Sequence, residues 1–523
     1  MEGMTVGWLA ERNAYKFPEK EAVVMQGPDG RREAVTHAAF NERADRVANG
    51  LREQGLEEGE KIAVYMQNNV ATLETYVGAM KLGVLPVPIN HRFKAEEVRY
   101  VLADSDAEAL VFDADAADVV DTLHDEATTP DRYFYVGERT PEYANPYADF
   151  VASAAGDSVD IVPTRLDEAM LMYTSGTTGD PKGCVLTHDN VLQRVTNGAV
   201  GSATEGKRER IDGRSLIVTP LFHIAAVGMF LNSFYLSATT VLMDDFVPQR
   251  VMEVLEAEAI TGGFFVPMMA RALLNVPGFE EYDLSAFETF GIGAAPSGRE
   301  LKATIQERFS TDLSEAFGQT EMSPTTTTLQ PSDVLEKPDS IGRPVLDVMV
   351  KIVDPETGKE VERGEIGQVC YKGPTQFAGY YNMPERTEDV IDEDGWFRSG
   401  DLVRRDEDGF VYFVGRVDDM IVSGGENVYP AEIEEALHEH EAIDEAAVVG
   451  VPDETWGERV KAAVVLGDRA DLTAEEVQAY VGSRLADFKK PREILLLDAL
   501  PRNPTGKVLK ADLEEADGEP LDA

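Results

Sequence analysis

The segment that most constrains this chain is the run YTSGTTGDPKG at residues 173–183, which combines glycines, hydroxyl side chains and a lysine. The apolar stretch 169–172 precedes it, so we expect a strand that leads into a loop. Glycine lets backbone N–H groups approach an anion, hydroxyls donate further hydrogen bonds, and lysine adds a positive charge. The residues predicted to hold a polyphosphate are Thr174, Ser175, Gly176, Thr177, Thr178, Gly179 and Lys182.

This run differs from the GxxxxGK[ST] loop of the common nucleotide hydrolases, because Gly176 and Gly179 are too close together and Lys182 is followed by glycine. We therefore expect an ATP-type ligand held by a different fold. The alternative is a flexible surface linker. A linker explains neither the preceding strand nor the Pro-Lys-Gly ending.

The charge of the chain excludes some partners. Its 523 residues include 96 acidic and 48 basic ones, which gives a formal net charge of −48. Nucleic acid and anionic membranes are unfavourable partners for such a surface. The acidic residues are spread along the chain, and only 17 of the basic residues are lysine. We interpret this as adaptation to a high-salt cytoplasm, where counterions screen the self-repulsion; the alternative is an acidic protein from an ordinary cytoplasm.

Cysteine content and hydropathy point to an intracellular protein. Cys184 and Cys370 are far apart in the sequence and are expected to be buried, with no disulfide framework or Cys-rich metal site. The N-terminus lacks the pattern of a signal peptide, and no stretch of about 18 apolar residues occurs. We expect a cytoplasmic protein without an integral membrane segment.

The pattern of strands and helices predicts an α/β fold. Strands at 61–65 and 107–113, with a helix at 70–82 between them, are typical of doubly wound, largely parallel sheets. We expect a large N-terminal domain over residues 1–415, with a small β-rich subdomain at about 340–415. Residues 416–523 predict a small α+β domain, in which Thr473 and Glu476 have the capping-box spacing of a helix start.

Five further segments combine glycine with polar or charged residues. The histidine of Thr219-Pro220-Leu221-Phe222-His223 follows a strand, where ligands collect in open α/β sheets, although a structural histidine is the simpler reading. Gly291 to Pro296 fits an adenine pocket or an ordinary tight turn. Glu321, in the segment from Ala316, is a candidate Mg²⁺ ligand.

The other two segments lie nearer the C-terminus. Asp401 follows a glycine turn, and a carboxylate there can accept both hydroxyls of a ribose. Lys507 lies on a Pro/Gly loop at 501–507 and, considered alone, is more often a solvated surface charge.

In this order and spacing, the segments resemble the adenylate-forming superfamily of acyl-CoA synthetases, nonribosomal-peptide adenylation domains and firefly-type luciferases. The resemblance covers residues from about 160 to 510. Its most specific parts are YTSGTTGDPKG and the run GRVDDMIVSGGENVYP at 415–430.

The resemblance implies a two-step reaction that uses ATP, Mg²⁺ and coenzyme A. A carboxylate attacks the α-phosphate of ATP to give acyl-AMP and pyrophosphate, and a thiol then displaces AMP. It also implies the residue roles. The metal ligands are Thr174 and Glu321; Thr320 contacts the α-phosphate; the nucleotide is lined by Gly293, Ala294, Ala295, Pro296, Phe317, Gly318 and Gln319, with Asp401 and Arg416 at the ribose.

The C-terminal domain supplies the remaining implied roles. Lys507 neutralises charge between the substrate carboxylate and the α-phosphate. The family rotates this domain between the two steps, which places the hinge at Asp418 and makes the domain mobile. After rotation a loop made by Ser423, Gly424, Gly425, Glu426 and Asn427 approaches the thioester centre.

The substrate is predicted from the candidate walls of the acyl pocket. His223 is expected at its mouth, with Val227, Gly228 and Met229 and the stretch 263–267 around it. These residues suit a medium- or long-chain fatty acid, or alternatively an aryl acid of the benzoate or coumarate type, better than an amino acid, whose ammonium would need a buried carboxylate.

Two other functions stay open at this stage. One is an adenylation enzyme that loads a separate carrier protein, and another is a non-catalytic nucleotide sensor, which intact Lys507 and Asp418 argue against. A homodimer is possible on the family resemblance alone. The chain departs from the family at Phe317, where tyrosine is common, and at Ser399, where threonine is common; neither change affects the reaction type.

Overall fold

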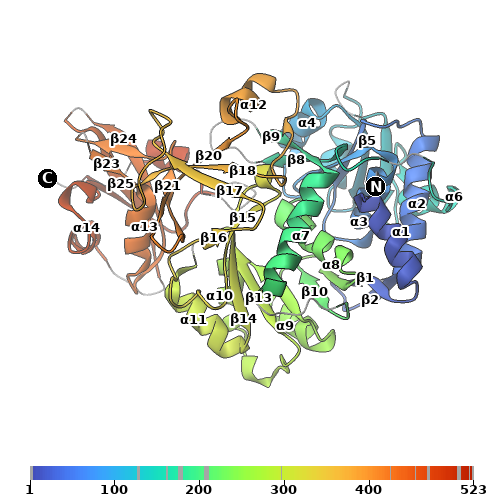
Figure 1. Cartoon of the computed structure of the whole chain (residues 1–523), viewed down its shortest axis with the longest axis horizontal. Helices are drawn as coiled ribbons and strands as arrows, with labels where there is room; N and C mark the ends of the chain where they lie inside the picture. Colours follow the sequence, from blue (N-terminus) through green and yellow to red (C-terminus); the bar gives the residue numbers. More distant parts are fainter. Residues whose placement is uncertain are drawn as a thin grey trace. The chain divides into compact units, whose positions relative to one another are not determined.

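The computed structural model describes residues 4–126, 130–160, 163–174, 181–204, 211–295, 297–424, 426–453, 455–467, 472–502, 508–517 and 519–520 (Figure 1). The chain divides into two compact units, one of residues 1–349 and 371–397 and the other of residues 350–370 and 398–523. This is the predicted mixed α/β fold with a larger N-terminal and a smaller C-terminal part. The boundary at residues 415 and 416 stays a prediction.

The first unit contains a five-stranded parallel sheet with the strand order β4-β3-β5-β6-β7. The predicted strands 61–65 and 107–113 and the helix 70–82 are confirmed. Asn69 caps the helix α3 at its start, and Gly83 ends it with a φ of 79°. The strands are β3 (Lys61–Tyr65), β4 (Leu85–Pro88), β5 (Ala107–Asp113), β6 (Arg132–Val136) and β7 (Asn145–Pro146), and the helices are α3 (Val70–Leu82), α4 (Ala95–Asp104), α5 (Ala117–Asp121) and α6 (Tyr147–Ser153).

The first unit also contains a nine-stranded sheet with the order β16-β15-β14-β13-β12-β10-β11-β1-β2. From β14 to β1 neighbouring strands are parallel, so their carboxyl ends lie along one edge. Ligands of open α/β sheets bind at such edges. The strands are β1 (Glu21–Gln26), β2 (Arg32–Thr36), β10 (Arg214–Ile217), β11 (Thr239–Met243), β12 (Gly262–Phe265), β13 (Thr289–Gly293), β14 (Asp312–Gly318), β15 (Thr325–Leu329) and β16 (Arg343–Pro344).

Helices flank this sheet and connect its strands (Figure 1). Their apolar residues form much of the buried core, as expected for helices that cover a parallel sheet. The helices are α1 (Val6–Lys16), α2 (His37–Glu53), α7 (His188–Thr204), α8 (Ile224–Tyr235), α9 (Pro248–Ala257), α10 (Pro267–Leu274) and α11 (Gly298–Phe309).

A small antiparallel sheet completes the first unit, with the order β19-β9-β8. The strand predicted before the glycine-rich run is β8 (Glu168–Thr174), and β9 (Lys182–Thr187) returns beside it, with Thr174 opposite Lys182. Strand β19 (Gly379–Tyr380) pairs with β9 and precedes α12 (Pro384–Val390).

The second unit includes most of a four-stranded sheet and a six-stranded sheet. Thr473 and Glu476 form the predicted capping box of α14. Val477 and Val481 of that helix are buried in the core, and Leu485 beyond it packs against the same cluster. The elements are β17 (Met349–Val353), β18 (Gly367–Lys372), β20 (Phe397–Arg405), β21 (Val411–Arg416), β22 (Ile421–Ser423), β23 (Glu426–Val428), β24 (Ile443–Asp453), β25 (Gly457–Leu466), β26 (Glu493–Leu497), β27 (Glu519–Pro520), α13 (Pro430–His438), α14 (Ala474–Gly482) and α15 (Lys510–Glu515).

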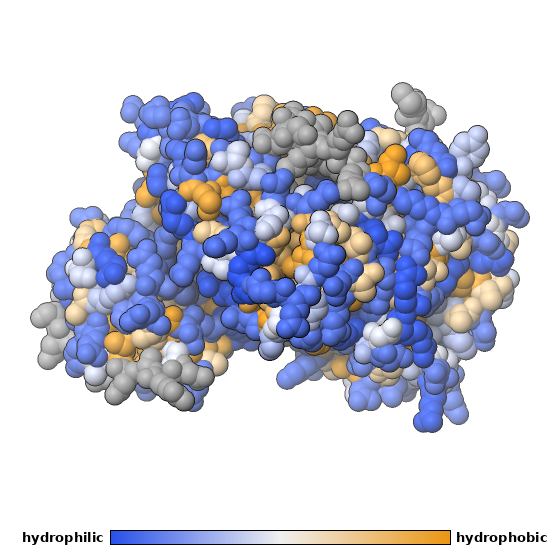
Figure 2. Space-filling model, turned by 90° about the horizontal axis from the view of Figure 1, so that it is seen from below, coloured by the Kyte–Doolittle hydropathy of each residue, from blue (hydrophilic) through white to orange (hydrophobic). Residues whose placement is uncertain are grey.

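The face drawn in Figure 2 is mostly hydrophilic, with apolar residues in small groups. Among the described residues, no helix is both long enough and apolar enough to cross a membrane. Cys184 and Cys370 are buried thiols, as predicted.

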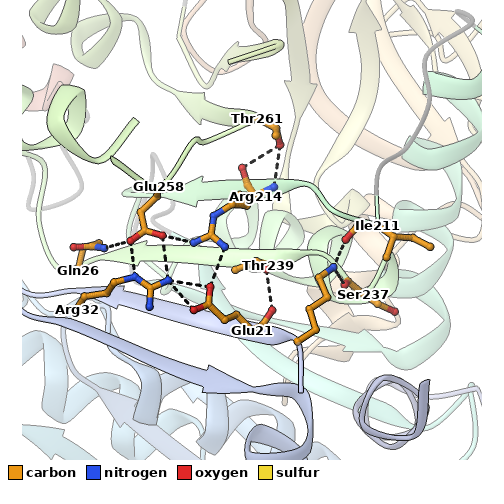
Figure 3. Close-up of polar contacts among 10 residues, drawn as sticks. Glu21, Gln26, Arg32, Ile211, Arg214, Ser237, Thr239, Glu258 and Thr261 are labelled. Atoms are coloured by element: carbon orange, nitrogen blue, oxygen red, sulfur yellow. Dashed lines mark hydrogen bonds and ion pairs between the residues drawn. The ribbon is translucent and has the colours of Figure 1, made fainter. Parts of the chain in front are cut away.

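Four charged residues from different parts of the chain connect β1, β2 and β10 of the nine-stranded sheet with the end of α9 (Figure 3). Arg32 contacts Glu258 and Glu21, each at 2.7 Å, and Arg214 contacts the same two carboxylates. Glu258 is almost completely buried, so its charge depends on these two partners.

We expect Glu258→Gln to lower the free energy of unfolding by about 2 kcal/mol, because two arginines then share one carboxylate; partial exposure of Arg32 keeps the loss below that of a fully buried pair. Denaturant titration at fixed salt measures this change in the free energy of unfolding. Glu280→Gln is the control, since the pair of Glu280 with Arg308 is exposed. Equal changes in the two variants would contradict a stabilising role for the network.

Candidate active site

The segment before His223 is held firmly at the carboxyl end of β10. The buried side chain of Asn68 accepts a hydrogen bond from the Leu221 backbone N–H at 2.8 Å. It also donates to the carbonyls of Thr219 and Met243, at 3.0 and 3.1 Å. The ends of β10 and β11 are thereby joined, and His223 follows as the residue that precedes α8.

His223 itself is uncharged at neutral pH. Its side chain is accessible to solvent, yet protein atoms surround it closely enough to disfavour a charge. The protein atoms around the ring, together with the nearby Arg92 and His91, lower the pKa of His223 to about 4. The ring of Phe222 lies 4.4 Å from its own. His223 therefore offers a neutral imidazole at this edge of the sheet.

The two segments predicted to line the nucleotide follow neighbouring parallel strands. Gly293 at the end of β13 pairs with Ala316 of β14. A Cβ atom on Gly293 would lie 2.3 Å from the Ala316 carbonyl oxygen, so only glycine fits there. Ala294 adopts a positive φ of 69°, and Ala294 and Ala295 are exposed, which leaves the edge free of bulky side chains. Pro296 lies outside the described residues.

A tight turn follows β14. Gln319 donates its backbone N–H to the Pro324 carbonyl at 2.8 Å, and a Cβ atom on Gly318 would lie 1.8 Å from that same oxygen. A short 3₁₀ helix, Thr320–Met322, then places Thr320 and Glu321 directly after the strand that carries Phe317.

Glu321 belongs to a cluster of polar groups from four segments. Tyr380 Oη donates to Glu321 Oε1 at 2.9 Å, and Lys182 Nζ lies 5.4 Å from the centroid of the Tyr380 ring. Tyr380 pairs with Cys184 across the strands β19 and β9. Burial, with the nearby charge of Glu321, raises the pKa of the Cys184 thiol well above its usual range, so this thiol is not a nucleophile. Thr174 hydrogen-bonds to the same thiol.

The cluster brings together Thr174, Lys182 and Glu321, and it adds Tyr380, which sequence reasoning missed. Its only signal was a pair of tyrosines after a glycine at 379–381. The hairpin of β8 and β9 holds the two ends of the glycine-rich run, with Thr174 Oγ1 donating to the Lys182 carbonyl at 3.4 Å. The predicted residues Ser175, Gly176, Thr177, Thr178 and Gly179 lie outside the described residues.

The donors of this cluster fit Mg²⁺, which prefers oxygen ligands and keeps waters and substrate phosphates in its shell. Glu321 supplies a buried carboxylate and Thr174 a hydroxyl. Within the described ranges no group of three or more His, Cys, Asp or Glu side chains is arranged for a metal. The single carboxylate of this cluster would hold Mg²⁺ together with phosphate oxygens of the nucleotide.

In the second unit, Asp401 and Arg416 form an ion pair in which the carboxylate is buried and the guanidinium is partly exposed. They lie opposite each other on β20 and β21, with Arg416 Nη1 at 2.7 Å from Asp401 Oδ1. Although burial opposes it, the ion pair raises the pKa of Arg416 above its usual value. Gly400 has a φ of 77°, and a Cβ atom there would lie 2.9 Å from the guanidinium. The glycine turn predicted before Asp401 thus makes room for Arg416.

The other predicted residues of this unit lie in turns. Asp418 is exposed in the turn after β21. Gly424, between β22 and β23, has a φ of 63°, and Glu426 and Asn427 are exposed on β23; Gly425 lies outside the described residues. Lys507 also lies outside them. The ends of its loop are paired, because Arg502 bridges to Val508 and Leu509 N–H donates to the Pro501 carbonyl at 2.9 Å.

The chain is similar to known proteins in both sequence and fold. The chain matches the family of AMP-binding enzymes over residues 10–381 and the AMP-binding enzyme C-terminal domain over residues 432–507. It is 36% identical to a long-chain-fatty-acid–CoA ligase, FadD13, of Mycobacterium tuberculosis, over 98% of both chains. It is 35% identical to a feruloyl-CoA synthase of Amycolatopsis sp, covering 99% of this chain and 100% of that protein.

A similar solved structure is o-succinylbenzoate CoA synthetase (MenE) from Bacillus subtilis with its acyl-adenylate intermediate, with a TM-score of 0.86, 28% identity and 100% of both chains covered. The chain therefore belongs to the AMP-binding enzymes, within the adenylate-forming superfamily of acyl-CoA synthetases that its motifs resemble.

Proposed function

We propose that this protein is an AMP-forming acid–CoA ligase that activates a carboxylic acid with ATP and Mg²⁺ and transfers the acyl group to CoA. The observation that carries the proposal is the cluster of Glu321, Tyr380 and Lys182, which lies between the end of β14 and the hairpin that carries the glycine-rich run. Family membership supports the reaction class, and the relatives include CoA ligases for aliphatic and aromatic acids.

The proposed reaction has two steps. An oxygen of the substrate carboxylate attacks the α-phosphorus of ATP, the bond to the bridging oxygen of the β-phosphate breaks, and pyrophosphate leaves. The CoA thiol then loses its proton and attacks the acyl carbon, and the bond from that carbon to the adenylate oxygen breaks to release AMP. Both reactants of the first step are anions, so the site must stabilise negative charge.

The first unit binds and orients the triphosphate in this proposal. Lys182 and the glycine-rich run bind the β- and γ-phosphates, and Thr320 contacts the α-phosphate. Tyr380 fixes the orientation of the Glu321 carboxylate, which with Thr174 holds Mg²⁺. Bound Mg²⁺ neutralises phosphate charge. Gly293, Ala294, Ala295, Pro296, Phe317, Gly318 and Gln319 line the base.

The second unit supplies the other proposed groups. Asp401 accepts hydrogen bonds from the ribose hydroxyls while Arg416 holds its carboxylate in place. Lys507 neutralises charge in the adenylation step, and Asp418 is the hinge. The residues 423–427 serve the thioester step, where Gly424 and Gly425 leave room for a narrow thiol arm.

The substrate we propose is a medium- or long-chain fatty acid. Ala226, Val227 and Phe230 of α8, the helix that begins directly after His223, are apolar, which suits an apolar acyl chain better than an amino acid. An aryl acid is the second candidate, favoured by the 35% identity to a feruloyl-CoA synthase.

The experiment is carboxylate-dependent AMP release with Mg-ATP in molar KCl, across acetate, fatty acids of increasing length, benzoates, cinnamates and amino acids, with and without CoA. We expect AMP release that requires both CoA and one class of acid. Pyrophosphate exchange with an acid but no CoA-dependent turnover would contradict a CoA ligase and indicate a carrier protein as the acceptor.

The compartment we propose is a high-salt cytoplasm. The oligomeric state we propose is a homodimer. With a net charge of −48, we expect the protein to unfold when KCl falls from molar to about 0.1 M, where screening of the self-repulsion weakens. Circular dichroism during dialysis measures this. Full activity and structure in dilute buffer would contradict adaptation to high salt.

We expect Tyr380→Phe to lower kcat/KM for Mg-ATP by about 10- to 100-fold, because a residue that orients a metal ligand contributes by that amount. Titrating Mg²⁺ at saturating acid separates this effect from a general loss. Tyr381→Phe is the matched control, since its hydroxyl binds Lys61 and Asp106 instead. Equal losses in both variants would contradict the role of Tyr380.

A further inference from the structure

Arg194 stands out among the residues of the helices that flank His223. It lies on α7, and its Nη1 donates to the carbonyl of Gly228 in α8 at 3.2 Å. The two helices pack side by side (Figure 1). The sequence predicts small, apolar walls around Gly228, so a guanidinium that contacts Gly228 changes the chemistry of this wall.

Arg194 has no acidic partner within the part of the chain that the structure describes. The single acidic residue of α7, Asp189, pairs with Arg165, and α8 contains no acidic residue. Burial, uncompensated by any nearby charge, lowers the pKa of Arg194 to about 10. At neutral pH the guanidinium is still charged. Arg194 is partly exposed, yet closely surrounded by protein, and an anionic ligand could supply the partner that its charge lacks.

The guanidinium also has free donors in accessible space. It carries five N–H groups. Among the described residues, one of these groups donates a hydrogen bond, to the carbonyl of Gly228. None of its nitrogens is among the fully buried, unpartnered atoms of the described residues, so the unused donors reach space that solvent or a ligand can enter.

Its position is set by Gly228. A Cβ atom at Gly228 would lie 3.4 Å from Arg194 Cζ, so the guanidinium packs directly on the backbone of α8. His223 precedes the first residue of α8, five positions before Gly228, which corresponds to about 7.5 Å along the helix axis. Gly228, which the guanidinium contacts, is thus further along α8 than His223 by about the length of a short acyl chain.

We propose that Arg194 binds a second carboxylate at the far end of the acid substrate, so that the enzyme prefers acids with a carboxylate at both ends. This inference rests on the proposed function and names its substrate class. A guanidinium matches a carboxylate with two parallel hydrogen bonds, and the second anion supplies the charge that the protein leaves unpaired.

The test compares matched acids at each length: octanoate with octanedioate, decanoate with decanedioate, dodecanoate with dodecanedioate, and cinnamate with 4-carboxycinnamate and 4-hydroxycinnamate. CoA-dependent AMP release gives kcat and KM for each. We expect at least about a 10-fold higher kcat/KM for a diacid than for its monoacid in the wild type. Arg194→Met should lower kcat/KM for the diacid by about 100-fold, mainly through KM, and leave the monoacid unchanged or improved.

Arg194→Lys keeps a charge but loses the planar fork, so we expect an intermediate preference. The control, Arg386→Met, removes an exposed arginine and should change neither acid. A wild-type preference for monoacids or hydroxylated acids at every length would overturn the inference, and so would an equal loss for both acids in Arg194→Met. If Arg194→Met does not fold, the inference is tested by the preference of the wild type for diacids and by the change of that preference in Arg194→Lys. AMP release with no acid at all would instead refute the proposed function.

Discussion

Lys507→Ala is expected to lower the rate of acyl-AMP formation by about 1000-fold, because the first step joins two anions and loses its main neutralising charge. Thioester formation from supplied acyl-AMP should stay within about 3-fold of the wild type, since Lys507 is proposed to act on the carboxylate and the α-phosphate only in the first step. Single-turnover measurements of the two half-reactions separate these effects.

Lys510→Ala is the matched control for Lys507→Ala. Lys510 is three residues away and pairs with Asp419 at 3.0 Å and with Glu434 at 3.6 Å. We expect both half-reactions to proceed in this variant. An equal loss of both half-reactions in Lys507→Ala would show that Lys507 does not act specifically in adenylation.

Glu321→Gln is expected to lower kcat for adenylation by about 100- to 1000-fold, because an amide keeps the shape of the side chain but removes the negative charge proposed to hold Mg²⁺. The apparent affinity for Mg²⁺ should fall as well, and higher Mg²⁺ should restore part of the rate. Pyrophosphate exchange at varied Mg²⁺ measures both effects.

Glu493→Gln provides the comparison for Glu321→Gln. Glu493 is also a buried carboxylate, but it pairs with Arg459 and Lys461 in the second unit. We expect that variant to lose stability, by about 2 kcal/mol, and to keep its Mg²⁺ dependence. If Glu321→Gln behaves like Glu493→Gln, Glu321 is a structural carboxylate and the proposed metal site is wrong.

Much of the fold could be predicted from local sequence signals. The helix α3 begins after Asn69, whose side chain caps the first turn, and ends at Gly83, whose backbone adopts a left-handed conformation. Both effects are local. The capping box at Thr473 is equally local. Some strands that precede the motif segments were also recognisable, since residues 169–172 and 215–220 are short, largely apolar runs that lead into turn residues.

The contacts that complete the site depend on residues far apart in the sequence. Tyr380 reaches Glu321 only because β19 adds to the edge of β9. Arg194 contacts α8, a helix that offers it no carboxylate, and this contact depends on how α7 and α8 pack. The network around Glu258 joins residues more than 200 positions apart. Such pairings follow from the packing of the sheets, so periodicity and motif spacing do not reveal them.

The most direct test of the account follows the oxygen of the substrate carboxylate. The protein is incubated in molar KCl with Mg-ATP, CoA and an accepted acid labelled with ¹⁸O in its carboxylate, and the products are analysed by mass spectrometry. Attack on the α-phosphorus predicts one labelled oxygen in AMP and unlabelled pyrophosphate. Labelled inorganic phosphate together with ADP would show attack on the γ-phosphate and would contradict the acyl-adenylate mechanism.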